Sequence, residues 1–260
     1  MSPPKPTPVS WQSSSHTLIL ALGAIHLWQV CLEVDSCQLK ALNQQLSVDE
    51  QARSTRFRNQ NDRERYIVAH GSLRTILSRY LETAPARLAF QHNAYGKPFL
   101  HPSCSEHIRF NMSRSGGLSL IAVAKEREVG VDIERIRHLN DSMQIAEQFF
   151  CPAECSFLGL LVPEERRQAF FRYWTLKEAF VKGRGQGLSI PLDQFEVCFQ
   201  GEKPILRGAS GRDGVDTGDW SLLELNPHPG YAAALAVEGR MGSISFWRLD
   251  HAEKIWCQDR

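Results

Sequence analysis

The six residues Val129-Gly-Val-Asp-Ile-Glu134 alternate strictly, with Val129, Val131 and Ile133 on one side and acidic residues on the other. A period of two is typical of a β-strand with one buried face. Such a strand needs strand partners and a covered apolar face, so the chain must fold around a sheet. Helical spacing of apolar residues over 62–82 and 163–181 predicts two long helices. Strands and helices come in blocks, which predicts an α+β protein with antiparallel hairpins.

Shorter signals predict the remaining elements. Ser47 and Glu50 have capping-box spacing and open a helix to about Asn59. Pro152 and Pro163 are expected at helix starts, and glycines 183, 185 and 187 should end the second long helix. Residues 90–100 read as a loop. The expected strands are residues 18–34 (one or two), 108–112, 117–125, 129–134, 189–199, 220–225, 231–237 and 243–249.

Two segments, 117–133 and 230–246, each run as an apolar strand, a charged turn and a second strand. This internal echo predicts two similarly built halves that meet near Glu128, with a ligand cleft between them. The expected division is a flexible tail at 1–10, an N-terminal half at 11–128, a C-terminal half at 129–250 and a C-terminal tail at 251–260. Because two halves in one chain already form a cleft, we expect a monomer.

Composition narrows the class. The chain has 260 residues, with 30 Lys+Arg against 29 Asp+Glu, which disfavours a protein that mainly neutralises nucleic-acid phosphate. The apolar stretch at 18–28 is too short for a membrane span, and the N-terminus lacks the features of a secretory signal. Seven cysteines at irregular spacing suggest reduced thiols. We therefore expect a cytoplasmic protein without nucleic-acid or membrane partners.

Asp132 and Glu134 leave the same face of their strand. Neighbouring carboxylates repel, so a cation between them would stabilise the pair, and oxygen ligands suit Mg²⁺ or Mn²⁺. The alternative is a solvated strand face with Arg135 and Arg137 as counter-charges.

Glu178 and Lys182 lie one helical turn apart in Trp174-Thr-Leu-Lys-Glu-Ala-Phe-Val-Lys182. A surface ion pair is the simpler interpretation. However, the surrounding helix is largely apolar, which favours a cleft. There, Glu178 would add a third carboxylate to the metal site, and Lys182 could touch an adjoining phosphate.

Basic residues are scattered upstream. Five arginines crowd residues 53–65, Lys97 lies in a Gly/Pro loop, and Ser113-Arg114-Ser115-Gly116 offers hydroxyls and a guanidinium. Each alone could be a solvated charge. Together with a magnesium site they indicate a ligand with several phosphates, because arginine binds phosphate through two hydrogen bonds.

Six motifs, in this order, resemble the 4′-phosphopantetheinyl transferases of the Sfp type. They span roughly residues 47 to 200 and are Gly96-Lys-Pro98, Phe110-Asn-Met-Ser-Arg-Ser-Gly116, Gly130-Val-Asp-Ile-Glu134, Phe149-Phe-Cys-Pro-Ala-Glu154, Trp174–Lys182 and Gly187-Leu-Ser-Ile-Pro-Leu192. The resemblance implies two similar α+β halves with coenzyme A in the cleft. It also implies a holo-acyl-carrier-protein synthase, which moves 4′-phosphopantetheine from coenzyme A to a serine of an acyl or peptidyl carrier protein and releases adenosine 3′,5′-bisphosphate.

The resemblance assigns roles residue by residue. Asp132, Glu134 and Glu178 would bind Mg²⁺, with Glu178 also the general base and Lys182 neutralising charge or giving a proton on the leaving-phosphate side. Lys97 and Ser113 would hold coenzyme A phosphate, and Arg53 and Arg65 match basic positions loosely. Arg114 stands where the family usually has a histidine that touches the 3′-phosphate. Since arginine is charged at every pH, we expect binding to be retained with less pH dependence.

Two other functions stay open from the residues: a magnesium-dependent nuclease, and a carrier-binding module without catalysis. Balanced charge disfavours the first, and the intact acidic residues with Lys182 disfavour the second. Neither the preferred carrier (fatty-acid, polyketide or nonribosomal-peptide) nor the tolerance for acyl-coenzyme A follows from the sequence.

Overall fold

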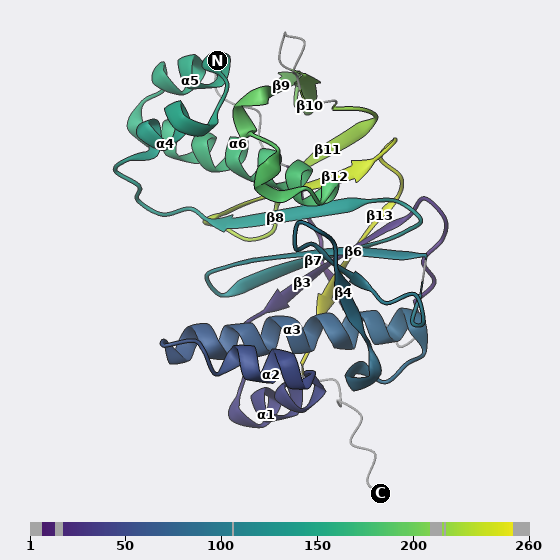
Figure 1. Ribbon diagram of the computed structural model, residues 1–260. Coiled ribbons are helices and arrows are strands. Elements are labelled where there is room, and N and C mark those ends of the chain that lie inside the picture. Colours follow the sequence, from purple (N-terminus) through teal and green to yellow (C-terminus); the bar gives the residue numbers. More distant parts are fainter. Residues whose placement is uncertain (1–6, 14–17, 106, 209–214, 216, 252–260) are drawn as a thin grey trace, which may run out of the picture.

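The computed structural model describes residues 7–13, 18–105, 107–208, 215 and 217–251. Two sheets pack face to face between two long helices (Figure 1). Helix α3 (Gln60–Leu81) covers the outer face of one sheet, and α6 (Pro163–Arg184) covers the outer face of the other. The α+β class is confirmed, and each half pairs a sheet with one long helix.

The five-stranded sheet belongs mainly to the N-terminal half. Its order is β2-β13-β3-β7-β6, with β3, β7 and β6 antiparallel and β13 parallel to both β2 and β3. The strands are β2 (Gln12–Ser13), β13 (Ile244–Leu249), β3 (Ile25–Cys31), β7 (Leu118–Lys125) and β6 (Ile108–Ser115).

The four-stranded sheet has the order β1-β11-β12-β8, in which β11, β12 and β8 are antiparallel. The strands are β1 (Thr7–Pro8), β11 (Trp220–Asn226), β12 (Tyr231–Glu238) and β8 (Val129–Arg135). Each sheet therefore takes a strand from the distant end of the chain: β1 joins the C-terminal sheet, and β13 joins the N-terminal one.

The internal echo corresponds to two crossovers and not to two hairpins. Strand β7 runs into β8 of the other sheet, and β12 runs into β13 of the other sheet. Apolar residues on both strands of each pair explain this, because their inner faces together fill the core between the sheets. Val131 and Ile133 are fully buried there, so the opposite face of β8, with Asp132 and Glu134, is turned toward α6.

The remaining elements are short. They are α1 (Ser36–Gln45), α2 (Val48–Ser54), η1 (Pro85–Arg87), β4 (Phe90–His92), β5 (Pro98–Leu100), α4 (Ser142–Phe149), α5 (Pro152–Gly159), η2 (Gly187–Ser189), η3 (Leu192–Gln194), β9 (Phe195–Gln200) and β10 (Lys203–Gly208). Among the described helices, none combines the length and apolarity that a bilayer span requires.

Several boundaries differ from expectation. Helix α1 was not predicted, although Asp35 and Gln38 form its capping box. The Ser47 capping box is present, but α2 ends at Ser54, five residues early. Residues 90–100 form the β4–β5 hairpin instead of a loop, and the strand expected over 18–34 is confined to Ile25–Cys31. The expected tails fall largely on residues 1–6 and 252–260, outside the described residues.

Candidate active site

Side chains of β6 cover the free edge of β8. Asn111 Oδ1 accepts a hydrogen bond from the backbone N–H of Val131 (2.9 Å), and Ser115 Oγ accepts one from the N–H of Arg135 (3.0 Å). These odd-numbered β6 side chains replace the missing strand neighbour of β8 and satisfy its backbone. The two sheets thus meet along a β6–β8 seam, and the same alternation brings Ser113 to Asp132.

Asp132 is the buried centre of the seam, only 2% exposed. Its Oδ1 accepts hydrogen bonds from Ser113 Oγ (2.8 Å) and Lys182 Nζ (2.6 Å), and Lys182 also donates to Ser113 Oγ (2.9 Å). Its Oδ2 is buried without a hydrogen-bond partner. A buried carboxylate oxygen normally has a partner, so Oδ2 offers an unused site for a cation or donor.

Glu134 lies two residues further along the same face and accepts a hydrogen bond from Ser115 Oγ (2.7 Å). Burial raises the pKa of Glu134, the Ser115 hydrogen bond opposes that rise, and the charge of Asp132 adds to it. Sequence reasoning assigns Ser115 no role of its own, although its alternation with Ser113 along the strand is the signal that places both at the seam.

Glu178 comes from α6 and is half-buried. Burial raises its pKa, the charges of Asp132 and Glu134 raise it further, and Lys182 opposes them. The three carboxylates therefore share one electrostatic environment. Gly130 explains how α6 comes so near: a Cβ there would lie 2.0 Å from the carbonyl oxygen of Ala179.

The three carboxylates are candidate ligands for a divalent cation. In the described part of the chain, no three His, Cys, Asp or Glu side chains are gathered closely enough to hold a metal ion as they stand. Lys182 Nζ occupies Asp132 Oδ1 instead. Nevertheless, the chemistry of the site fits Mg²⁺ or Mn²⁺. Oδ2 of Asp132 has no hydrogen-bond partner among the described residues, the pKa values of Glu134 and Glu178 are raised, and all the candidate ligand atoms are oxygens.

A basic cluster lies on the α3 side of the N-terminal sheet. Partial burial lowers the pKa of Arg114, Asp62 and Tyr66 oppose this, and the charges of Arg53 and Arg65 lower it further. Arg53 and Arg65 are therefore close enough to Arg114 to repel its charge. Such a cluster favours a multiply charged anion, which would relieve that repulsion.

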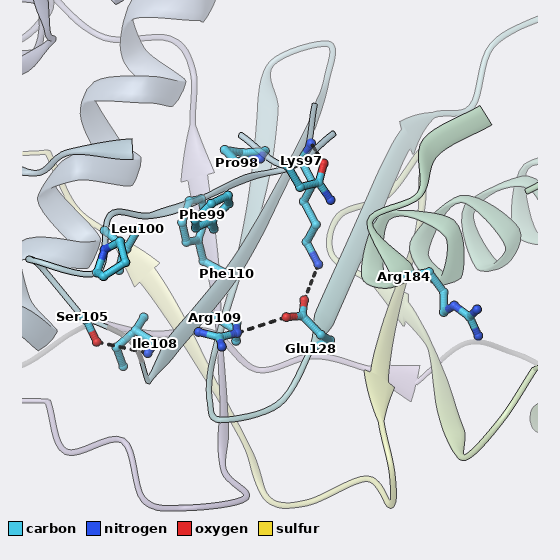
Figure 2. A pocket seen from close by; sticks show the side chains of 12 residues that line it. Lys97, Pro98, Phe99, Leu100, Ser105, Ile108, Arg109, Phe110, Glu128 and Arg184 are labelled. Atoms are coloured by element: carbon cyan, nitrogen blue, oxygen red, sulfur yellow. Dashed lines mark hydrogen bonds and ion pairs between the residues drawn. The ribbon is translucent and has the colours of Figure 1, made fainter. Parts of the chain in front are cut away.

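Lys97 contacts the start of β8 and the last turn of α6. Its Nζ donates to Glu128 Oε2 (2.6 Å) and to the carbonyl oxygens of Gly183 (2.7 Å) and Val129 (3.4 Å). It borders a cavity of about 630 Å³ that Arg109 and Arg184 also line (Figure 2). The structure thus brings together Ser113, the acidic residues and Lys182, gathers the arginines separately, and commits Lys97 to protein partners.

Comparison with known proteins identifies the class to which this fold and site belong. Residues 128–236 match the 4′-phosphopantetheinyl transferase superfamily model, and residues 32–126 match the model for a 4′-phosphopantetheinyl transferase N-terminal region. The 4′-phosphopantetheinyl transferase HetI of Nostoc sp. is 36% identical over 240 residues, covering 92% of this chain and 98% of HetI.

Two further proteins are similar over shorter stretches of the chain. The 4′-phosphopantetheinyl transferase Sfp of Bacillus subtilis is 32% identical over 152 residues, 58% of this chain and 66% of Sfp. A Bacillus anthracis holo-(acyl-carrier-protein) synthase, solved in complex with CoA (3′,5′-ADP), aligns with 44% of this chain and 96% of its own at 20% identity and a TM-score of 0.36. The chain belongs to the 4′-phosphopantetheinyl transferase family, as the full-length match to HetI shows.

Proposed function

We propose that this protein transfers 4′-phosphopantetheine from coenzyme A to a serine of an acyl or peptidyl carrier protein, in a Mg²⁺-dependent reaction that releases adenosine 3′,5′-bisphosphate. The observation that carries the proposal is the contact of Lys182 with Asp132 and Ser113. Glu178 interacts electrostatically with Lys182, Asp132 and Glu134. Carboxylates that would hold a divalent cation, together with an ammonium group on the same seam, suit a diphosphate substrate. Family membership supplies the substrate class.

The chemistry joins the carrier serine oxygen to the phosphorus that bears pantetheine and breaks the bond from that phosphorus to the bridging oxygen of the diphosphate. A bound divalent cation, held by Asp132, Glu134 and Glu178, would supply positive charge for the developing anion. Glu178 accepts the serine proton, directly or through water. Lys182 stabilises the departing phosphate oxygen through charge and hydrogen bonding.

The arginine cluster binds the nucleotide end. Arg53, Arg65 and Arg114 present permanent charges that match the 3′-phosphate of coenzyme A. Ser113 is within reach of the same substrate because its hydroxyl faces Lys182 and Asp132. We expect a monomeric, cytoplasmic enzyme in fatty-acid, polyketide or nonribosomal-peptide synthesis, and parallel transfer rates on purified carriers would rank its partners.

Intact-mass spectrometry of a carrier incubated with coenzyme A and Mg²⁺ tests the proposal. Transfer adds one phosphopantetheine to the carrier serine. Glu178→Gln should slow transfer by a factor of about 100 or more because the base is lost, whereas Glu165→Gln, at an exposed position at the start of α6, should not. A carrier-binding module would bind the carrier without this mass change, and a nuclease would instead degrade nucleic acid; either result would refute the transferase.

A further inference from the structure

Lys97 lies in the turn of the β4–β5 hairpin, and hydrogen bonds within the turn hold its shape. Asn93 Oδ1 accepts from the N–H groups of Tyr95 and Lys97 (both 2.9 Å), and Asn93 N–H donates to the Lys97 carbonyl (3.0 Å). Gly96 takes the left-handed φ of 87° that closes the turn. Asn93 Nδ2 then reaches across to the carbonyl oxygen of Gly185, the C-cap of α6, at 2.6 Å.

Lys97 makes a second, charged contact with the same end of α6. An ammonium has three hydrogens, and Lys97 Nζ has three acceptors: Glu128 Oε2, the Gly183 carbonyl and the Val129 carbonyl. Its side chain is only 14% exposed. A cation at the C-terminus of a helix is also favourable because it satisfies terminal carbonyl groups and opposes the helix dipole.

Glu128 holds the ammonium in place. It lies directly before β8 and accepts from Lys97 through Oε2 and from Arg109 Nε through Oε1 (3.1 Å). Figure 2 shows Glu128 between the two basic side chains, where the β4–β5 hairpin, β6 and the start of β8 meet. We name this arrangement, Lys97 with Glu128 and the carbonyl groups of Gly183 and Val129, the Lys97 clasp.

The Lys97 clasp includes the residue next to Lys182 in the sequence. Gly183 directly follows Lys182, whose Nζ contacts Asp132 and Ser113. Fixing the Gly183 carbonyl therefore fixes the last turn of α6 relative to the start of β8. Displacement of Lys182 by about 1 Å would be enough to slow a positioned reaction about 100-fold.

We propose that Lys97 is a positioning residue, which with Glu128 locks the last turn of α6 so that Lys182 points at the diphosphate, and that it does not itself bind a coenzyme A phosphate. This rests on the proposed function and replaces the role that resemblance alone suggests for Lys97. All three hydrogens of its ammonium have protein acceptors, and a phosphate could be bound only after these contacts broke.

The test compares Lys97→Met and Glu128→Gln with Lys203→Met, a control at an exposed lysine of β10. Three quantities are measured: amide hydrogen exchange across residues 181–185 without ligand, the Kd for adenosine 3′,5′-bisphosphate by calorimetry, and kcat and KM for transfer. For both clasp variants we expect faster exchange, a Kd within about twofold of wild type, and a kcat lowered about tenfold or more. The double variant should lose less than the sum of the two single effects, because the partners act as a unit.

A Kd raised about tenfold in Lys97→Met would overturn the inference, since the loss of one charge-assisted hydrogen bond to phosphate weakens binding by about that factor. Unchanged exchange in the 181–185 segment would overturn it equally. Should Lys97→Met fail to fold, Glu128→Gln gives the same readouts, because it weakens the clasp without removing the lysine. If wild type transfers nothing, the proposed function fails, while exchange and nucleotide affinity still decide the role of Lys97.

Discussion

Lys182 Nζ lies 2.6 Å from Asp132 Oδ1, and the carboxylate is almost fully buried while the ammonium side chain is about one-third exposed. The pair joins the last turn of α6 to the middle of β8. Lysine thus neutralises in this structure the same carboxylate that the family resemblance assigns to a metal ion, so a bound cation would compete with the ammonium for the negative charge of Asp132.

Replacing Lys182 by methionine should expose that competition. The variant leaves a buried charge unpaired, which costs up to about 3 kcal/mol after allowance for the partly exposed lysine. Mg²⁺ should then raise the melting temperature of Lys182→Met more than that of wild type, while transfer falls sharply. Differential scanning calorimetry with Mg²⁺ or with chelator measures this, and equal shifts in the two proteins would contradict the competition between the ion and Lys182.

Gly130→Ala should separate the two halves of the site. A Cβ at this position would overlap the Ala179 carbonyl and the Gly183 backbone, so α6 must move away from β8. We expect a loss of about 3 kcal/mol, the upper end for overpacking, and a large fall in kcat. Gly159→Ala is the matched control, because nothing lies within 4 Å of its added methyl group. Denaturant unfolding that finds the two variants equally stable would contradict the close approach.

Arg114→Ala tests the nucleotide site. Wild type should prefer coenzyme A over 3′-dephospho-coenzyme A, and the variant should lose about tenfold or more of that preference because one charged contact disappears. The preference in wild type should also stay nearly constant between pH 6 and 8, since arginine does not titrate there. Calorimetric titrations with both ligands supply the ratio, and an equal ratio in both proteins would remove Arg114 from the site.

His26 should make stability depend on pH. It is buried beside Tyr80 (Nδ1 to hydroxyl, 2.8 Å), and burial lowers its pKa from the ordinary 6.5 to about 4. Between these values the unfolded chain binds a proton that the folded protein does not, so the free energy of unfolding falls as the pH drops from 6.5 to 4. His26→Gln should flatten this slope by up to one proton, whereas His92→Gln, at an exposed histidine, should not. Urea unfolding at several pH values gives the slopes; identical slopes for wild type and His26→Gln would contradict the assignment.

The sequence was most informative where the periodicity of apolar residues agrees with the residues that mark the ends of helices and strands. The alternation of 129–134 predicts both the buried face of β8 and the shared face of Asp132 and Glu134, and the prolines at 152 and 163 mark the starts of α5 and α6. These are local properties, which single residues and their neighbours determine.

The sequence could not reveal relations between distant segments. Residues 117–133 read as a hairpin, but whether two adjacent strands pair with each other or join separate sheets depends on the partners of each. The contacts of Lys97 with Gly183 and of Ser115 with Glu134 likewise join residues far apart in the chain. No periodicity within either segment carries that information, so sequence reasoning predicts Lys97 only as a phosphate contact and assigns Ser115 no role of its own.

The exchange of β1 and β13 between the sheets has a consequence for how the protein is made. Strand β3 acquires its parallel neighbour only after residues 244–249 have been synthesised, long after β3 itself. The N-terminal sheet therefore keeps an open edge at β3 until that point. Two fragments cut at the middle of the chain would each lack a strand, and only their mixture could restore both sheets.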